Sequence, residues 1–92
     1  MKYFDWNEEK NIKLLLEREV CFEDVLLAIE EGRLTDVLTH ESKKYVGQKI
    51  FVVEISGYAF LVPFVEDDEK IFLKTIIPSR KATKKYLIKT DE

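Results

Sequence analysis

The residues best suited to chemistry lie near the C-terminus, in a short segment that follows a proline. Its basic and aromatic side chains are Arg80, Lys81, Lys84, Lys85 and Tyr86. Pro78 ends the preceding strand and Ser79 is a typical helix N-cap, so Arg80 and Lys81 fall in the first helical turn. Cations are unfavourable at that end of the helix dipole, whereas free backbone N–H groups beside two cations suit an anion. We therefore predict that this segment binds a phosphate, which Arg80 would hold with two hydrogen bonds. The alternative is a structural role, in which Arg80 pairs with an acid of the N-terminal helices.

The rest of the chain offers few other sites. His40 is the single histidine and Cys21 the single cysteine, and they are far apart, so no metal site is predicted. Three isolated glycines provide neither a P-loop nor a dinucleotide fingerprint. No cofactor is therefore expected. His40 lies in a polar stretch and reads as a surface loop residue, with a functional role as the alternative.

The elements that must position the basic segment follow from the hydrophobic periodicity. We expect two N-terminal helices, from the Asn7 cap to about Arg18 and from Phe22 to Glu31, and a last basic helix from Ser79 to about Leu87. The predicted strands are Leu34–Thr39, Lys49–Ile55, Tyr58–Val65 and Lys70–Ile77. The expected fold is α+β, with a four-stranded antiparallel sheet in a single domain spanning residues 1–92.

Two features of the strands carry further expectations. The strand from Tyr58 is apolar on both faces, so either the helices cover both faces of the sheet or some apolar surface is reserved for a partner protein. Pro63 interrupts a strand that a meander makes central. Because proline cannot donate to the ladder, we expect a bulge or a local edge there.

Charge and composition narrow the classes of partner. The chain of 92 residues has a net charge of −3, which argues against a generic nucleic-acid binder. Residues 1–31 carry a net charge of −5 and residues 70–92 a net charge of +5. This asymmetry suggests that the C-terminal end meets an anion, with a solvated lysine helix as the alternative. One cysteine and no long apolar stretch favour a cytoplasmic protein without a membrane segment.

Three motifs resemble the BrnT family. The segment Ile77-Pro78-Ser79-Arg80-Lys81-Ala82-Thr83, followed by Lys84-Lys85-Tyr86, is similar to the C-terminal signature of that family. Phe4-Asp5-Trp6-Asn7-Glu8-Glu9-Lys10 is similar to its opening, and Phe22-Glu23-Asp24-Val25 to the start of its second helix. The motifs occur in the family's order and extend over nearly the whole chain.

The resemblance implies a toxin of a bacterial type II toxin–antitoxin system. Members of the family have a RelE-like fold and cleave RNA without a metal. The implied partners are a cognate antitoxin with a ribbon-helix-helix domain and an RNA substrate, free or on the ribosome. Operator DNA would be bound only through the antitoxin. An alternative is a non-catalytic member of the same fold that binds a partner protein, for example as a co-repressor; a third is a housekeeping domain unrelated to toxins.

The implied reaction is attack of a ribose 2′-OH on the adjacent phosphate, which needs a base, a cation at phosphorus and an acid for the leaving oxygen. Arg80 best fits the cation. Lys49, Lys74 and Lys81 are candidates for further phosphate contacts, with Lys84 and Lys85 beside them. Tyr86 or His40 is the candidate for proton transfer.

The chain departs from the family pattern at several positions. Thr75 stands where members often carry a basic residue, and Phe64 where they often carry a polar one, frequently histidine. Pro78 replaces the usual serine, and the acid that often follows the basic stretch is missing. These departures bear on catalysis more than on the fold.

Overall fold

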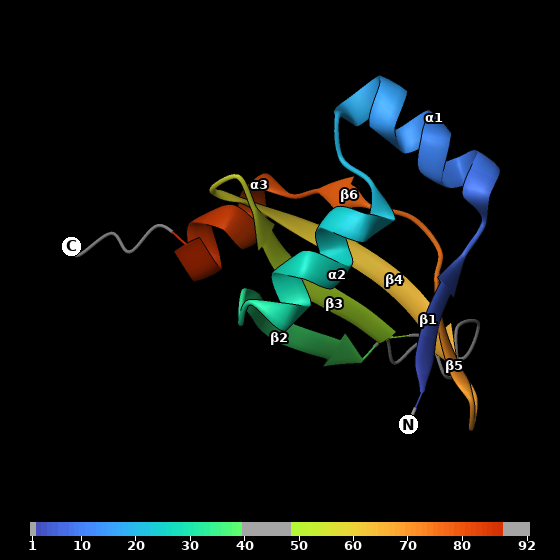
Figure 1. The fold of residues 1–92 in the computed structure, drawn as a ribbon. Coiled ribbons are helices and arrows are strands. Elements are labelled where there is room, and N and C mark those ends of the chain that lie inside the picture. Colours follow the sequence, from blue (N-terminus) through green and yellow to red (C-terminus); the bar gives the residue numbers. More distant parts are fainter. Residues whose placement is uncertain (1, 40–48, 88–92) are drawn as a thin grey trace.

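A six-stranded mixed β-sheet forms the body of the molecule (Figure 1). The computed structural model describes residues 2–39 and 49–87. In chain order, the strands are β1 (Tyr3–Trp6), β2 (Leu34–Thr39), β3 (Lys49–Ile55), β4 (Tyr58–Glu66), β5 (Lys70–Leu73) and β6 (Ile77–Pro78). The helical elements are α1 (Glu8–Arg18), α2 (Phe22–Glu30), α3 (Arg80–Ala82) and the π-helix η2 (Thr83–Leu87). Within the described ranges, no helix is long and apolar enough to cross a membrane.

The predicted four-stranded antiparallel sheet of a RelE-like α+β fold is wrong. The strand order is β1-β5-β4-β3-β2, with β6 paired to β4 beside β5. A strand, β1, precedes the two helices and pairs in parallel with β5, Tyr3 opposite Lys70 and Trp6 opposite Leu73. The strand predicted over residues 70–77 is divided, because residues 74–76 leave the ladder before β6 begins. The sheet is therefore larger than predicted, and mixed.

The corner between α1 and α2 is held by a buried asparagine. Asn11 is 5% exposed, its Oδ1 accepts a hydrogen bond of 2.6 Å from the Phe22 backbone N–H, and its Nδ2 donates to Glu23 at 2.8 Å. The Cys21 backbone N–H donates to the Asp24 carboxylate at 3.1 Å, so an acid in the first turn stands in for the weak cysteine cap. These bonds satisfy donors that the start of a helix leaves free.

Helix α1 turns most of its apolar side chains away from the core. Asn7 caps it by accepting a bond of 3.0 Å from the Lys10 backbone N–H, as its sequence predicts. Leu14 is 2% exposed, whereas Ile12, Leu15 and Leu16 are 53%, 50% and 79% exposed. The periodicity thus identified the helix, but its apolar stripe faces solvent in the described structure.

The sheet separates two apolar clusters. The larger cluster lies between the sheet and the N-terminal helices and includes Phe22, Val25, Phe51, Phe64 and Leu73. The smaller cluster joins Val52, Ala59 and Ala82, with Leu38, Leu61, Tyr86 and Leu87 packed around it, beneath the C-terminal helix. Helices thus pack on both faces, but Val37 and Val65 remain 44% and 36% exposed.

One turn and one strand edge follow directly from residue type. Ser56 and Gly57 both have positive φ, 55° and 79°, which suits the tight hairpin between β3 and β4. Strand β4 pairs with β6 at Phe60–Leu61 and with β5 at Phe64–Glu66. Pro63 falls between these two pairings, at the local edge that a proline predicts.

Candidate functional site

The C-terminal helix is fixed to the start of β4 by the backbone N–H of Ser79 and the hydroxyl of Thr83. Ser79 caps α3, since its Oγ accepts a bond of 3.0 Å from the Ala82 N–H, and its own N–H donates to the Ala59 carbonyl at 3.0 Å. Thr83 is 5% exposed; its Oγ1 accepts from the Ala59 N–H at 2.9 Å and donates to the Ser79 carbonyl at 2.8 Å. Ser79, Ala82 and Thr83 of the C-terminal motif therefore have structural roles.

The cations of the motif have no such role. Arg80, Lys81, Lys84 and Lys85 are exposed, and none forms an ion pair with an acid of residues 2–39 or 49–87. Helices α1 and α2 lie within those residues, so the structural alternative in which Arg80 pairs with their acids is not observed. Within the described part of the chain, four cations on eight residues of helix are therefore available for an anion.

Among the described residues, one hydrogen bond between two side chains joins this helix to the sheet, and it links Tyr86 to Asp36. The Tyr86 hydroxyl donates to Asp36 Oδ2 at 2.6 Å, and the Val37 N–H donates to Oδ1 at 2.7 Å. The hydrogen bond from Tyr86, followed by that from Val37, lowers the pKa of Asp36, and Lys85 acts in the same direction. The hydrogen bond to Asp36 raises the pKa of the Tyr86 phenol. At neutral pH the pair is thus a carboxylate and a neutral phenol.

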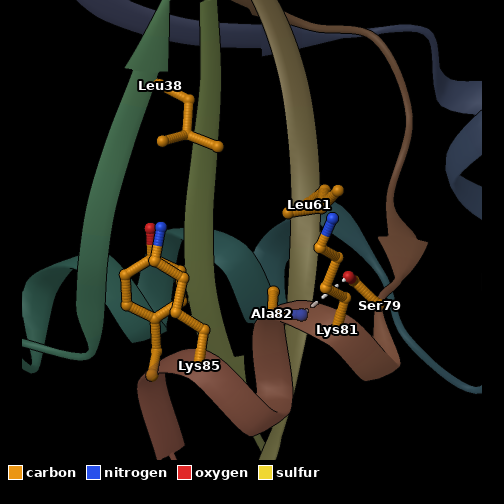
Figure 2. A pocket seen from close by; sticks show the side chains of 7 residues that line it. Leu38, Leu61, Ser79, Lys81, Ala82 and Lys85 are labelled. Atoms are coloured by element: carbon orange, nitrogen blue, oxygen red, sulfur yellow. Dashed lines mark hydrogen bonds between the residues drawn. The ribbon is translucent and has the colours of Figure 1, made fainter.

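A pocket of about 190 Å³ opens beside this contact (Figure 2). Its lining is mostly apolar and comes from the sheet and from the C-terminal helix: Leu38, Leu61, Ser79, Lys81, Ala82, Lys85 and Tyr86. Figure 2 shows Lys81 extending over the sheet toward Leu61. The Lys85 ammonium lies 5.2 Å from the centre of the Tyr86 ring. The pocket therefore combines an apolar floor with a cationic rim.

The structure brings only some of the predicted site residues together. Lys81, Lys85 and Tyr86 line the pocket, and Arg80 and Lys84 are exposed on the same helix. Lys74 is exposed in the break after β5, where its backbone N–H donates to the Pro63 carbonyl at 2.8 Å. His40 lies outside the described residues.

Lys49 is separated from the basic helix by the sheet. Its ammonium pairs with Glu66 at 2.8 Å, and Lys2 pairs with the same carboxylate at 3.0 Å. Side chains alternate along a strand, so Lys49 shares a face with Phe51, in the cluster under the N-terminal helices. Lys49 therefore does not join the phosphate-binding group that the sequence predicted.

The departures from the BrnT pattern have mixed structural explanations. Phe64 is 2% exposed and stacks on Phe51, with ring centroids 4.0 Å apart, so this position is part of the core. Thr75 is half-buried, and Pro78 is exposed at the end of β6. The described residues that line the pocket do not include Phe64, Thr75 or Pro78.

Asp36 is the site residue that sequence reasoning missed. It lies in β2, fifty positions before Tyr86. One sequence feature could have identified it: Asp36 is an acid inside a predicted strand. In the structure that strand alternates half-buried and exposed positions, and Asp36 is at a half-buried one. Among the described residues, no three His, Cys, Asp or Glu side chains group closely enough to hold a metal ion.

Comparison with known proteins adds no relative. No family model matches the chain, and neither the curated proteins nor the solved structures include a match to it.

Proposed function

We propose that this chain is the toxin of a bacterial type II toxin–antitoxin system, and that it cleaves RNA without a metal. The observation that carries the proposal is the set of four exposed cations on the C-terminal helix that form no ion pair with any acid of residues 2–39 and 49–87. The BrnT-like motifs in the sequence support it independently of the geometry. A chain of net charge −3 would bind RNA through this local patch and not through its overall field.

In the proposed reaction the ribose 2′-oxygen attacks phosphorus and the bond to the 5′-oxygen breaks. The products are a 2′,3′-cyclic phosphate and a 5′-hydroxyl, and the proton of the 2′-OH leaves while the 5′-oxygen gains one. Arg80 would stabilise the charge on the phosphoryl oxygens, with Lys81 and Lys85 beside it. Tyr86 is the candidate to protonate the leaving oxygen. Its phenol has a single proton, which it donates to Asp36 in the structure, so the hydroxyl would have to turn from Asp36 to the leaving oxygen in that step.

Asp36 would serve this reaction by holding Tyr86. Its lowered pKa makes the carboxylate a weak base at neutral pH. We therefore assign it the positioning of the phenol at 2.6 Å and not the removal of the 2′-OH proton. The base remains unassigned among the described residues.

The partners and setting belong to the same proposal. A cognate antitoxin with a ribbon-helix-helix domain would neutralise the toxin and carry the complex to operator DNA. A single cysteine leaves no intrachain disulfide, which favours the reducing cytoplasm.

The test is cleavage of end-labelled RNA by the purified full chain in excess EDTA, with and without ribosomes. Wild type is compared with Arg80→Ala, and Lys10→Ala serves as a matched control because Lys10 is an exposed helix lysine on α1. Cleavage lost in Arg80→Ala and kept in Lys10→Ala supports the proposal. Cleavage that survives Arg80→Ala places the activity elsewhere, and no cleavage under any condition favours the non-catalytic protein-binding module.

A further inference from the structure

The described surface has an apolar stripe on α1. Ile12, Leu15 and Leu16 occupy positions i, i+3 and i+4 and are each at least 50% exposed. One exposed leucine is ordinary on a protein surface, whereas three large aliphatic side chains on one helix face form the seam by which helices dock. Within the described residues nothing covers this stripe.

Acidic side chains stand at both ends of the stripe. Glu8 and Glu9 precede Ile12 by one turn, and Glu19 follows Leu16 at the helix end. The spacing of Glu8, Ile12 and Glu19 places these residues on the same side of the helix. Glu8 also accepts a bond of 3.1 Å from the Trp6 indole. A surface that fits the stripe should therefore be apolar and bordered by cations.

The pocket beside the C-terminal helix has that combination. Leu38, Leu61 and Ala82 form its apolar floor, and Lys81 and Lys85 its cationic rim. Its volume of about 190 Å³ exceeds the ~150 Å³ of an apolar cavity that accepts a benzene-sized group. One leucine side chain fits such a pocket.

The stripe belongs to α1 and the pocket to the C-terminal helix and the strands beneath it. Figure 1 shows the two helices apart, α1 at the upper right and the C-terminal helix at the left, so the stripe does not reach the pocket of its own chain. We propose that a second copy of this chain fills the pocket with Leu16 of its α1, and that its acids face Lys81 and Lys85. The contact joins two different surfaces. An open chain of copies therefore keeps a free stripe at one end and a free pocket at the other, and it can add further copies or close into a ring. Both patches are small, so the association is weak, in the micromolar range or above.

This inference does not depend on the proposed function. Self-association needs only the apolar and charge fit of the two patches, whereas RNA cleavage needs Arg80 and a substrate. The two are measured separately, and either can fail alone.

Sedimentation of the full chain tests the proposal, over about 10 to 500 µM protein and at about 0.05 M and 0.5 M salt. The mass of wild type should rise above the monomer's 10.9 kDa with concentration, and less so at high salt. Leu16→Ser and Lys81→Glu should each stay monomeric. Leu27→Ser, which alters another exposed leucine, on α2, should associate like wild type. Circular dichroism checks that every variant is folded.

Mixing the two variants gives the decisive result. Leu16→Ser keeps an intact pocket and Lys81→Glu keeps an intact stripe, so their mixture should form a dimer that grows no further. A wild type that is monomeric throughout the range overturns the proposal and leaves the stripe to a different protein. Association that survives Lys81→Glu also overturns the proposal, since that result indicates symmetric contact between two copies of α1. A mixture of the two variants that remains monomeric overturns it as well.

Discussion

The Tyr86 hydroxyl donates a hydrogen bond of 2.6 Å to Asp36 and thereby ties the last helical turn to β2. The two residues are fifty positions apart, and no other polar side-chain contact joins these elements among the described residues. The stability of the C-terminal helix, and with it the position of its cations, should therefore depend on this bond.

Tyr86→Phe should destabilise the protein at pH 7. The folded-state pKa of Asp36 is below its unfolded value, so its contribution is present above about pH 4 and is lost as the pH falls through the folded pKa. The folded-state pKa of Tyr86 is raised, so its contribution is present below about pH 10 and is lost as the pH rises through that raised pKa. Urea unfolding of both proteins from pH 3 to 8 measures this. A difference that persists unchanged at pH 3 would exclude the bond as its cause.

Thr83→Val should lower the free energy of unfolding by about 1–3 kcal/mol. The substitution keeps the shape of the buried side chain but leaves the Ala59 N–H without its acceptor. Thr83→Ser retains the hydroxyl and is the matched control. If urea titrations followed by circular dichroism show no loss for Thr83→Val but a loss for Thr83→Ser, the methyl group matters and the hydrogen bond does not.

Two leucines on α1 should respond differently to truncation. Leu14→Ala should cost about 2–5 kcal/mol, because Leu14 is 2% exposed and its removal leaves a cavity in the core. Leu16→Ala should change the stability by less than about 0.5 kcal/mol, because that side chain is 79% exposed. Unfolding is measured in dilute protein, where copies do not associate. A large loss for Leu16→Ala would mean that α1 packs by its other face.

Binding of single-stranded RNA should weaken with salt in proportion to the phosphates neutralised. Each contact contributes a slope of about −0.7 to the plot of log K against log salt concentration, so four cations predict about −3. Arg80→Ala and Lys84→Ala should each reduce the slope by about 0.7, whereas Lys10→Ala should leave it unchanged. Fluorescence anisotropy of a labelled oligonucleotide measures the slope. Equal slopes in all four proteins would place the RNA elsewhere.

Much of the element order could be predicted, because periodicity and caps are local signals. The bounds of β2 and β3 match the predicted ranges, and Asn7 caps α1 as predicted. The errors arose where contacts between distant residues decide. Strand β1 has four residues, too few to show a period, and its partner lies more than sixty positions away. The sequence also gives no sign of the break after β5. Ile76 is fully buried, as a strand residue would be, but it does not belong to the ladder.

The candidate site was only partly predictable for the same reason. The cations and Tyr86 are adjacent in the sequence, so they could be found together. The partner of Tyr86, Asp36, lies on another element, and the exclusion of Lys49 depends on which face of the sheet it occupies. Burial has the same limit: a stripe at positions 12, 15 and 16 identifies a helix, but only the folded neighbours decide whether the stripe is covered.

The pairing of β1 with β5 also sets an order for folding. During synthesis β1 emerges more than sixty residues before its hydrogen-bonding partner, Lys70–Leu73. Long-range parallel pairings of this kind close late because the loop they span must be ordered first. Helices α1 and α2 and the β2–β4 meander can therefore form while β1 is still unpaired. Asn7 joins β1 directly to α1, so this late pairing adds a second constraint on the orientation of α1, beside the bonds of Asn11 to α2.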